Sequence, residues 1–234
     1  MNKEWYYNEY LQTGTDFSDI KKVEAYDTKM TKFRNYQREA EWILDTLGVA
    51  SGQVLLDIGT GTGHFALAAA KKCQKVYAVD ISKTMLEYAK LKAKKENISN
   101  IEWQHSGFLN FDFPGIKFDH VVSSAALHHL PDHWKQVAIN NIYKALKDQG
   151  NFYLGDVIFS SGNIDEIDAK IEAWLDNMKN IDAELSQEAV LHVKKEYSTF
   201  AWIIEGMFGQ VGFKYQKLVD ASNFMSYLCT KSPK

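Results

Sequence analysis

Val54-Leu-Leu-Asp57-Ile-Gly59-Thr-Gly61-Thr-Gly63-His-Phe65 is the stretch that decides the fold. A short apolar run ends in an acid, three glycines follow at alternate positions, and a helical pattern then begins. This order predicts a buried strand, a tight turn and a helix N-terminus. The glycines allow a ligand to approach the backbone, and the first helical N–H groups can bind something polar or anionic. A glycine-rich turn without a ligand is the alternative at this point.

The rest of the chain alternates strands with helices around that turn. We expect strands at 54–58, 75–79, 101–105, 118–122 and 151–158, and helices at 30–47, 63–72, 83–96 and 132–147. Such alternation predicts a parallel sheet covered on both faces. The tail predicts a helix at 197–211 and an antiparallel hairpin of strands at 213–219 and 224–230. The expected fold class is therefore α/β, a doubly wound, seven-stranded, mostly parallel, Rossmann-like sheet with a C-terminal hairpin and a helical cap.

Length and composition limit the possible functions. The 234 residues with 45% apolar content suit one large domain, and no apolar run approaches the roughly 20 residues that span a membrane. The N-terminal residues lack an apolar signal-peptide core, so we expect a cytoplasmic protein. The net charge of −3 does not demand a basic face, and we do not expect nucleic acid as a partner. Cys73 and Cys229 cannot form a metal cluster alone, and we expect buried, reduced thiols.

The spacing of the glycines and two acids indicates the kind of ligand. The dinucleotide fingerprint is G-x-G-x-x-G, whereas Gly59, Gly61 and Gly63 are one residue closer together. Asp57 would repel a pyrophosphate but attract an ammonium group. Asp80 ends the next strand, about 20 residues beyond the glycines, where a carboxylate suits the two hydroxyls of a ribose. These features favour a ribose with a cationic or zwitterionic tail, which S-adenosylmethionine fits better than NAD.

Three motifs carry a family resemblance: VLLDIGTGTG, VYAVDIS and FDHVVSSAALHHLPD. Together they resemble the class I S-adenosylmethionine-dependent methyltransferases, and most of all the group of ubiquinone/menaquinone C-methyltransferases and uncharacterised small-molecule methyltransferases. The resemblance covers residues 40–160, and 198–232 in pattern. It implies S-adenosylmethionine as cofactor, S-adenosylhomocysteine as product and methyl transfer to a small-molecule acceptor.

The resemblance also implies roles for matching positions. The glycine turn (Gly59, Thr60, Gly61 and Gly63) would pass the methionine part and the ribose. Asp57 would support the amino end and Asp80 would bind the ribose hydroxyls. Adenine would be contacted by Ile81, Met85, Gly107 and Phe108, and the wall near the sulfonium would be formed by Ser124, Ala125 and Leu127. Many relatives have an acid near 107 that accepts a hydrogen bond from adenine, and the glycine here leaves adenine recognition open.

Under this resemblance the chain is one domain, 1–234. Residues 1–40 form an N-terminal helical cap or lid, 41–158 the cofactor-binding core, 159–200 a cap insertion, and 201–234 the C-terminal helix and hairpin. The insertion interrupts the regular pattern after Asp156, and extra material at this end of a doubly wound sheet usually builds or covers a ligand site.

The chemistry is an in-line displacement from a sulfonium, which needs a general base only if the acceptor must lose a proton. His128 and His129 follow a strand end and are the candidate catalytic residues, with His133 and Tyr197 as further candidates. Consecutive side chains diverge, so at most one of the pair should face the cleft, and a histidine that only supports its loop is the alternative. Asp156 could contact substrate or merely close the sheet. The run His128, His129, Asp132 and His133 could suggest a metal, but we expect none.

Other functions stay open on the sequence alone. One is a cofactor-binding protein without transfer activity, another is an RNA or tRNA methyltransferase, and an NAD-dependent oxidoreductase is opposed by the glycine spacing. A small, partly apolar or aromatic acceptor is favoured by Trp5, Tyr6, Tyr7, Trp174 and Tyr197 in the two cap segments. The sequence does not decide the oligomeric state, and a homodimer is compatible with it.

Overall fold

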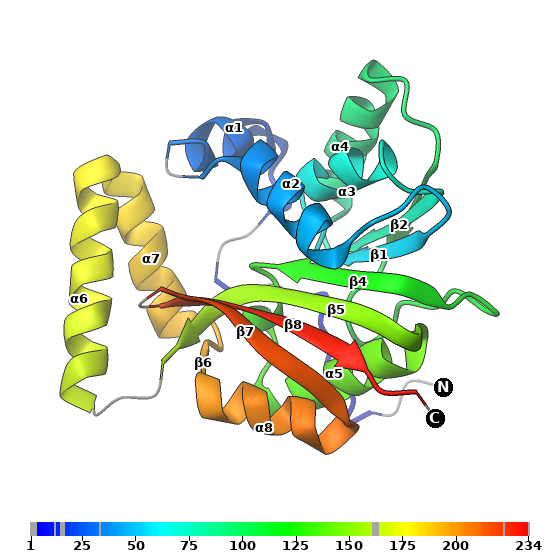
Figure 1. The fold of residues 1–234 in the computed structure, drawn as a ribbon. Helices are drawn as coiled ribbons and strands as arrows, with labels where there is room; N and C mark the ends of the chain where they lie inside the picture. Colours follow the sequence, from blue (N-terminus) through cyan, green and yellow to red (C-terminus); the bar gives the residue numbers. More distant parts are fainter. Residues whose placement is uncertain are drawn as a thin grey trace.

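A single mixed sheet organises the protein in the computed structural model, which describes residues 4–11, 13–14, 17–32, 34–160, 164–221 and 223–233. The strand order is β3-β2-β1-β4-β5-β8-β7 (Figure 1). The strands are β1 Val54–Ile58, β2 Lys75–Asp80, β3 Ile101–His105, β4 Phe118–Ser124, β5 Leu146–Phe159, β6 Thr199–Phe200, β7 Phe213–Ala221 and β8 Phe224–Lys231. The first five strands pair in parallel, and β8 runs antiparallel to both β5 and β7. The predicted doubly wound sheet with an antiparallel hairpin is confirmed.

One strand more than predicted belongs to this sheet in the described residues. β6 consists of two residues and pairs in parallel with the end of β5, off the main strand order. It lies where the sequence predicted the first turn of a helix from 197 to 211. The helix begins only at Ala201, because Thr199 and Phe200 are extended.

Helices cover both faces of the sheet. The helices are α1 Ile20–Met30, α2 Tyr36–Leu47, α3 His64–Ala70, α4 Lys83–Lys95, α5 Asp132–Ala145, α6 Ile164–Ile181, α7 Ala183–Lys195 and α8 Ala201–Val211, with a short 3₁₀ turn at Leu127–His129. The face with α2, α3 and α4 has its own buried cluster, and α5 and α8 pack into the cluster on the opposite face. In Figure 1, α6 and α7 stand at one end of the sheet, beside the carboxyl ends of its parallel strands.

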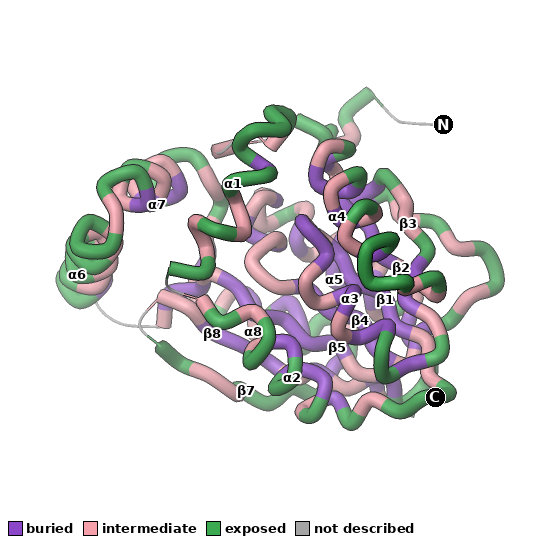
Figure 2. Tube along the Cα trace, turned by 90° about the horizontal axis from the view of Figure 1, so that it is seen from above, coloured by how far each residue is buried: buried purple, intermediate pink, exposed green. Residues whose placement is uncertain are grey.

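Alternating side chains explain why both faces are apolar. On β1, Leu55 packs into the cluster with α2 and α3, while Leu56 and Ile58 pack into the cluster with α5 and α8. Successive side chains of a strand point to opposite faces, so a strand in the middle of a two-sided sheet must be apolar throughout. The tube in Figure 2 shows these central strands as the continuous buried part of the molecule.

Two further predicted helix boundaries were wrong. The helix expected over 30–47 begins only at Tyr36 as α2, after Asn35, whose side chain accepts a hydrogen bond from the backbone N–H of Arg38, and Met30 is instead the last residue of the separate helix α1. The helix expected over 132–147 ends at Ala145, because Leu146 is already extended and pairs with Phe118 of β4. The cap insertion contains two helices, α6 and α7, joined at Asp182, which caps α7.

Candidate functional site

Backbone conformation and close packing together explain the three glycines of the turn between β1 and α3. Gly59, Gly61 and Gly63 all have positive φ angles, of 75°, 53° and 82°. A β-carbon on Gly59 would lie 2.4 Å from the β-carbon of Ala126, so the loop after β4 packs against this position. A β-carbon on Gly63 would lie 2.9 Å from that of Ala89 on α4. Of the three glycines, Gly61 alone has no atom within 4 Å of the position that a β-carbon would take, and it lines the cavity described next.

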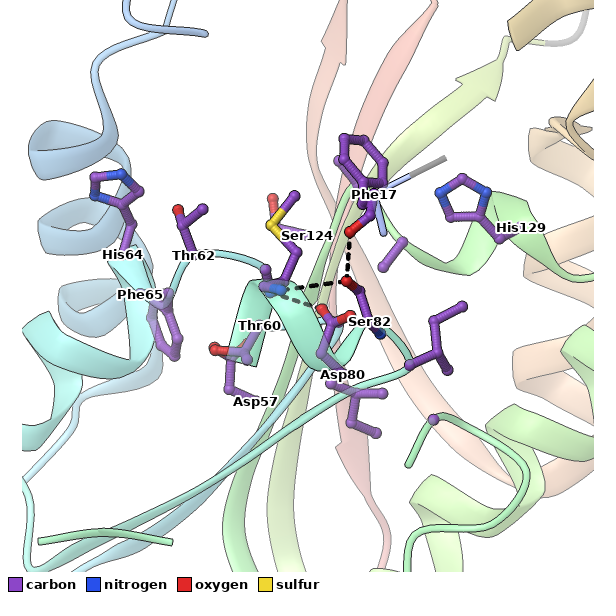
Figure 3. A pocket seen from close by; sticks show the side chains of 18 of the residues that line it. Phe17, Asp57, Thr60, Thr62, His64, Phe65, Asp80, Ser82, Ser124 and His129 are labelled. Atoms are coloured by element: carbon purple, nitrogen blue, oxygen red, sulfur yellow. Dashed lines mark hydrogen bonds between the residues drawn. The ribbon is translucent and has the colours of Figure 1, made fainter. Parts of the chain in front are cut away.

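A cavity lies over this turn at the carboxyl edge of the sheet (Figure 3). The following residues predicted to bind cofactor line it: Asp57, Gly59, Thr60, Gly61, Asp80, Ile81, Met85, Gly107, Phe108 and Ser124, and Ala125 joins them. Gly63 and Leu127 do not line it. Gly63 instead faces α4, and Leu127 is buried in the core on the side of α5.

Two buried carboxylates form the floor of the cavity. Asp80 Oδ2 accepts a hydrogen bond from the backbone N–H of Gly61 at 2.8 Å, and its Oδ1 accepts from that of Ser82 at 2.8 Å. Asp57 Oδ2 accepts from the hydroxyl of Thr60 at 2.6 Å. Burial and then the nearby Asp80 charge raise the pKa of Asp57 to about 7, and burial also raises the pKa of Asp80. Two neighbouring buried acids suit a ligand that brings positive charge and hydroxyl donors.

A third acid in the wall comes from the N-terminal segment and was missed by the sequence analysis. Glu9 is buried, and both of its carboxylate oxygens accept hydrogen bonds from the backbone N–H of Leu109, at 3.0 and 3.2 Å. It occupies the place that a side chain at residue 107 would fill, since a β-carbon on Gly107 would lie 2.3 Å from Glu9 Oε2. Burial raises the pKa of Glu9 to about 7. The missing acid near 107 was the signal that could have prompted a search for a replacement.

The segment that includes α1 covers the glycine turn. Asp27 of α1 accepts hydrogen bonds from the hydroxyl of Thr62 at 2.5 Å and from Lys92 Nζ at 2.8 Å, and lies 3.0 Å from His64 Nε2. Although burial alone would raise it, these partners lower the pKa of Asp27 to about 2. Nearby, the hydroxyl of Ser82 donates to the carbonyl of Phe17 at 2.8 Å, as Figure 3 shows.

Arg34 provides a cation in the cavity wall between α1 and α2. Its guanidinium pairs with Glu39 at 2.6 Å, approaches Ser124 Oγ at 3.5 Å and lies over the ring of Tyr36. Tyr36 in turn stacks on His64 with ring centroids 4.1 Å apart. The sequence offered no motif for these residues, because they act through tertiary placement.

The two adjacent histidines have different surroundings. His129 lines the cavity, on the side opposite His64 in Figure 3. Burial and the neighbouring His128 lower the pKa of His129 to about 4, so its ring is neutral at pH 7. His128 does not line the cavity. Its Nδ1 lies 2.5 Å from Asp156 Oδ1, and its backbone N–H donates to Asp156 Oδ2 at 3.1 Å. We predicted that at most one of His128 and His129 would face the cavity, and His129 is the one that does.

The cap insertion adds a carboxylate to the histidine pair. Glu196 follows α7, and its Oε2 lies 3.3 Å from His128 Nε2 and in contact with His192 Nδ1. Although burial alone would lower it, Asp156 and then Glu196 raise the pKa of His128 to about 9. The buried acids and imidazoles thus join the end of β5, the 3₁₀ turn and the insertion.

Other candidate side chains lie elsewhere. His133 is exposed and packs against Trp134, while Asp132 pairs with Lys135 at 2.8 Å, so the run from 128 to 133 does not gather around one point. The aromatic residues expected to surround an acceptor are also outside the cavity wall: Trp5, Tyr6 and Tyr7 pack around Trp134, Trp174 contacts His192, and Tyr197 is partly exposed. The aromatic side chains in the wall are instead Phe17, Tyr26, Tyr36, Phe65 and Phe108.

Comparison with known proteins relates this site to a family. Residues 55–150 match a family model described as a methyltransferase domain. An uncharacterized methyltransferase of Geobacillus sp. (strain WCH70) is 31% identical over 154 residues, which are 64% of this chain and 68% of that protein. The chain belongs to the methyltransferase family. The predicted methyltransferase family is therefore confirmed, and with it a transferase activity.

Two further similarities place this methyltransferase among its relatives. The demethylmenaquinone methyltransferase of the same strain is 27% identical over 137 residues, and that match spans 56% of this chain and 58% of that protein. A solved S-adenosylmethionine-dependent methyltransferase from Clostridium acetobutylicum superposes with a TM-score of 0.70 at 13% identity, over 91% of this chain and 98% of that one. The similarity to the Clostridium acetobutylicum structure shows a shared fold. In the described part of this methyltransferase, no helix combines the length and apolarity needed to cross a membrane.

Proposed function

We propose that the protein transfers a methyl group from S-adenosylmethionine to a small-molecule acceptor bound in the same cavity. The observation that carries this proposal is the pair of buried acids, Asp57 and Asp80, beneath the one open glycine of the turn. A ribose would replace water as the donor to Asp80, and the cationic end of the cofactor would balance Asp57. S-adenosylmethionine supplies an activated methyl group on its sulfonium when bound.

The other charged side chains of the wall suit the two remaining polar parts of this cofactor. Arg34 would bind the carboxylate of the methionine part, because it is a guanidinium in the wall beside Ser124. Glu9 would accept a hydrogen bond from the amino group of adenine, since a carboxylate has about four acceptor sites and this one lies against Gly107. Ile81, Met85 and Phe108 supply the apolar surface around the ring.

A small acceptor fits the enclosure of the site. Among the described residues, Asp27 of α1 contacts the glycine turn and Phe17 contacts Ser82 at the cavity. The wall also includes five aromatic rings, which favours a small acceptor over a large folded one. The similar demethylmenaquinone methyltransferase acts, by its name, on demethylmenaquinone, which is neither a protein nor a nucleic acid. We therefore favour a small, partly apolar acceptor over tRNA, in a protein that we expect in the cytoplasm.

His129 is the side chain that would meet the acceptor. Its neutral ring can accept a hydrogen bond from a hydroxyl, amine or thiol and so orient the attacking atom in line with the methyl group. A pKa of about 4 makes it a weak base, so orientation and exclusion of water would account for most of its effect. His128 acts behind it, as the positioning residue held by Asp156.

Calorimetric titration with S-adenosylhomocysteine tests the cofactor assignment. Asp80→Ala should weaken binding more than tenfold, about 1.4 kcal/mol or more, and NADH should not bind to the wild type. Asp45→Ala is the matched control, because Asp45 is an exposed acid that pairs with Lys72 at the surface. An Asp80→Ala protein with wild-type affinity would refute the assignment.

Transfer of a labelled methyl group tests the acceptor class. Wild-type protein and labelled S-adenosylmethionine are incubated with a panel of small phenols, quinols, amines and thiols, and separately with bulk tRNA. Label should move to at least one small molecule and not to tRNA. Labelling of tRNA alone would support an RNA methyltransferase, and tight cofactor binding without any transfer would support a binding protein without activity.

A further inference from the structure

Three side chains beside the cavity place potential metal-ligating atoms close together. One atom each from His128, His129 and Glu196 lies within 4.8 Å of the others. Imidazole nitrogens and a carboxylate oxygen are the ligands of many catalytic sites for zinc-like ions, commonly two histidines and one acid. The three residues come from the turn after β4 and from the end of the cap insertion, so only the folded chain brings them together.

The other ring nitrogen of His128, Nδ1, has the kind of partner that a metal-bound histidine usually has. Asp156 Oδ1 lies 2.5 Å from His128 Nδ1, which fixes the ring and directs Nε2 away from β5. A ligating histidine usually donates its other ring N–H to a carboxylate in this way. Asp156 is also fixed, because its two oxygens accept from the backbone N–H groups of His128 and Val157.

The separation of one pair of these atoms matches two ligands of a shared ion. Nitrogen and oxygen ligands lie about 2.0–2.2 Å from zinc, and a tetrahedral angle then separates two of them by about 3.3–3.5 Å. His128 Nε2 and Glu196 Oε2 are 3.3 Å apart. We propose that His128, His129 and Glu196 bind one divalent transition-metal ion of the zinc type.

The competing explanation is a set of buried ion pairs without a metal. In that case Asp156 and Glu196 would simply flank a charged His128, and His192 would add a second contact to Glu196. This explanation does not account for the position of the His129 ring, which lies 4.3 Å from that of His128. A metal ion would be bound by His128, His129 and Glu196 together, and the contact from His192 would then orient the Glu196 carboxylate.

The place of the ion suggests its role. His129 lines the cavity, so an ion that it binds lies at the cavity wall, where three protein ligands leave a fourth position for an outside atom. This role rests on the proposed function: the acceptor would be a molecule with a hydroxyl or thiol, which binds the ion through oxygen or sulfur and loses its proton to solvent more readily there. The lone pair so exposed forms the new bond to the methyl carbon as the sulfonium–methyl bond breaks.

Cobalt titration of the 234-residue chain tests the site directly. After dialysis against a chelator and its removal, Co²⁺ is added and visible absorption is recorded, because four-coordinate cobalt absorbs far more strongly than the hydrated ion. We expect saturation at one Co²⁺ per chain and displacement of the signal by Zn²⁺. Glu196→Gln and His129→Ala should each weaken binding at least tenfold, and His133→Ala, an exposed histidine four residues from His129, should not.

The outcomes separate the metal site from the methyltransferase site. Circular dichroism and S-adenosylhomocysteine affinity, measured on each variant, show whether it is folded and retains its cofactor site. A wild-type protein that binds no Co²⁺ stoichiometrically would overturn the proposal in favour of ion pairs alone. Stoichiometric binding that survives in Glu196→Gln would also overturn it, because the ion would then be elsewhere. Neither result would affect the cofactor proposal, which depends on the Asp80 titration.

Discussion

A β-carbon at residue 107 would lie 2.3 Å from Oε2 of Glu9, so the glycine there is what allows a carboxylate from the N-terminal segment to reach the cavity wall. Gly107 is not among the residues with positive φ, and its backbone can therefore accept any side chain. The close approach, and not backbone conformation, is the reason for glycine at this position.

Gly107→Ala should consequently act by displacing Glu9. We expect a three- to tenfold weaker affinity for S-adenosylhomocysteine, and a similar loss in Glu9→Ala, measured by calorimetry. The double variant should bind no more weakly than either single one, because both changes remove the same contact. Gly206→Ala is the control, since a β-carbon there meets nothing within 4 Å. Strictly additive losses would show that Gly107 acts independently of Glu9.

Glu9 should also determine preference for adenine over hypoxanthine. An analogue with an oxygen in place of the adenine amino group cannot donate the hydrogen bond that the carboxylate accepts. Wild-type protein should therefore prefer S-adenosylhomocysteine to S-inosylhomocysteine at least tenfold, and Glu9→Ala should reduce this preference. Equal preference in both proteins would mean that Glu9 only supports the turn at Leu109.

Asp57 should make cofactor affinity depend on pH. The pKa of Asp57 is about 7 in the folded, ligand-free protein, so its carboxyl group is partly protonated at neutral pH. The carboxyl group must lose that proton before it can pair with the cationic end of the cofactor. Affinity for S-adenosylmethionine should rise between pH 6 and pH 8, by up to about tenfold per pH unit below the pKa. Asp57→Asn should flatten this profile. The measurement is made in a Glu9→Gln background, because Glu9 has a pKa of about 7 as well.

The raised pKa of Asp57 also predicts how the stability of the ligand-free protein depends on pH. The folded pKa of Asp57 lies above its usual value of 3.8, so the folded state binds a proton more tightly than the unfolded chain. Stability should fall as pH rises from about 4 to about 7, by on the order of 4 kcal/mol for complete ionisation. Urea unfolding of Asp57→Asn should lack this part of the pH dependence. A profile identical to that of wild type would show that Asp57 is ionised at lower pH than its burial indicates.

The parts of this site that the sequence predicts are those held by local structure. Asp57, Gly61 and Asp80 lie at strand ends and in a tight turn, where pattern and spacing directly determine position. The helix predicted over 83–96 begins after Ser82, whose hydroxyl accepts a hydrogen bond from the backbone N–H of Met85. Such features depend on residues within one strand–turn–helix unit.

The missed parts depend on contacts between distant segments. Glu9 reaches Leu109 across 100 residues, and Glu196 reaches the histidine pair from the end of the insertion. Neither has a local pattern, because what places each of them is packing of the caps against the sheet edge. The helix predicted over 132–147 illustrates the opposite error: the local pattern extends to residue 147, yet the tertiary pairing of Leu146 with Phe118 ends the helix at Ala145.

Asp156 should be important for both the stability and the metal affinity of the histidine cluster. Its carboxylate and His128 form a buried pair, and removal of one charge leaves the other without compensation. In the presence of a chelator, Asp156→Asn should lower the free energy of unfolding by about 3 kcal/mol. Cobalt affinity should fall tenfold or more, as is usual for the partner of a ligating histidine. Glu96→Gln, which breaks the exposed pair with Lys71, should cost less than about 1 kcal/mol.

Asp27 should control how firmly α1 covers the cofactor site. Its carboxylate joins α1 to Thr62 in the glycine turn and to Lys92 on α4, at 2.5 and 2.8 Å, so the cover and the turn share one charged contact. Asp27→Asn keeps the shape but loses the charge, and an amide has only one acceptor oxygen for these donors. We expect amide hydrogen exchange in residues 20–30 to become about tenfold faster, with affinity for S-adenosylhomocysteine reduced threefold or more. Glu24→Gln, an exposed acid on the same helix, should change neither. If Asp27→Asn left both quantities at wild-type values, the cover would have to be held by the Phe17–Ser82 contact and not by this acid.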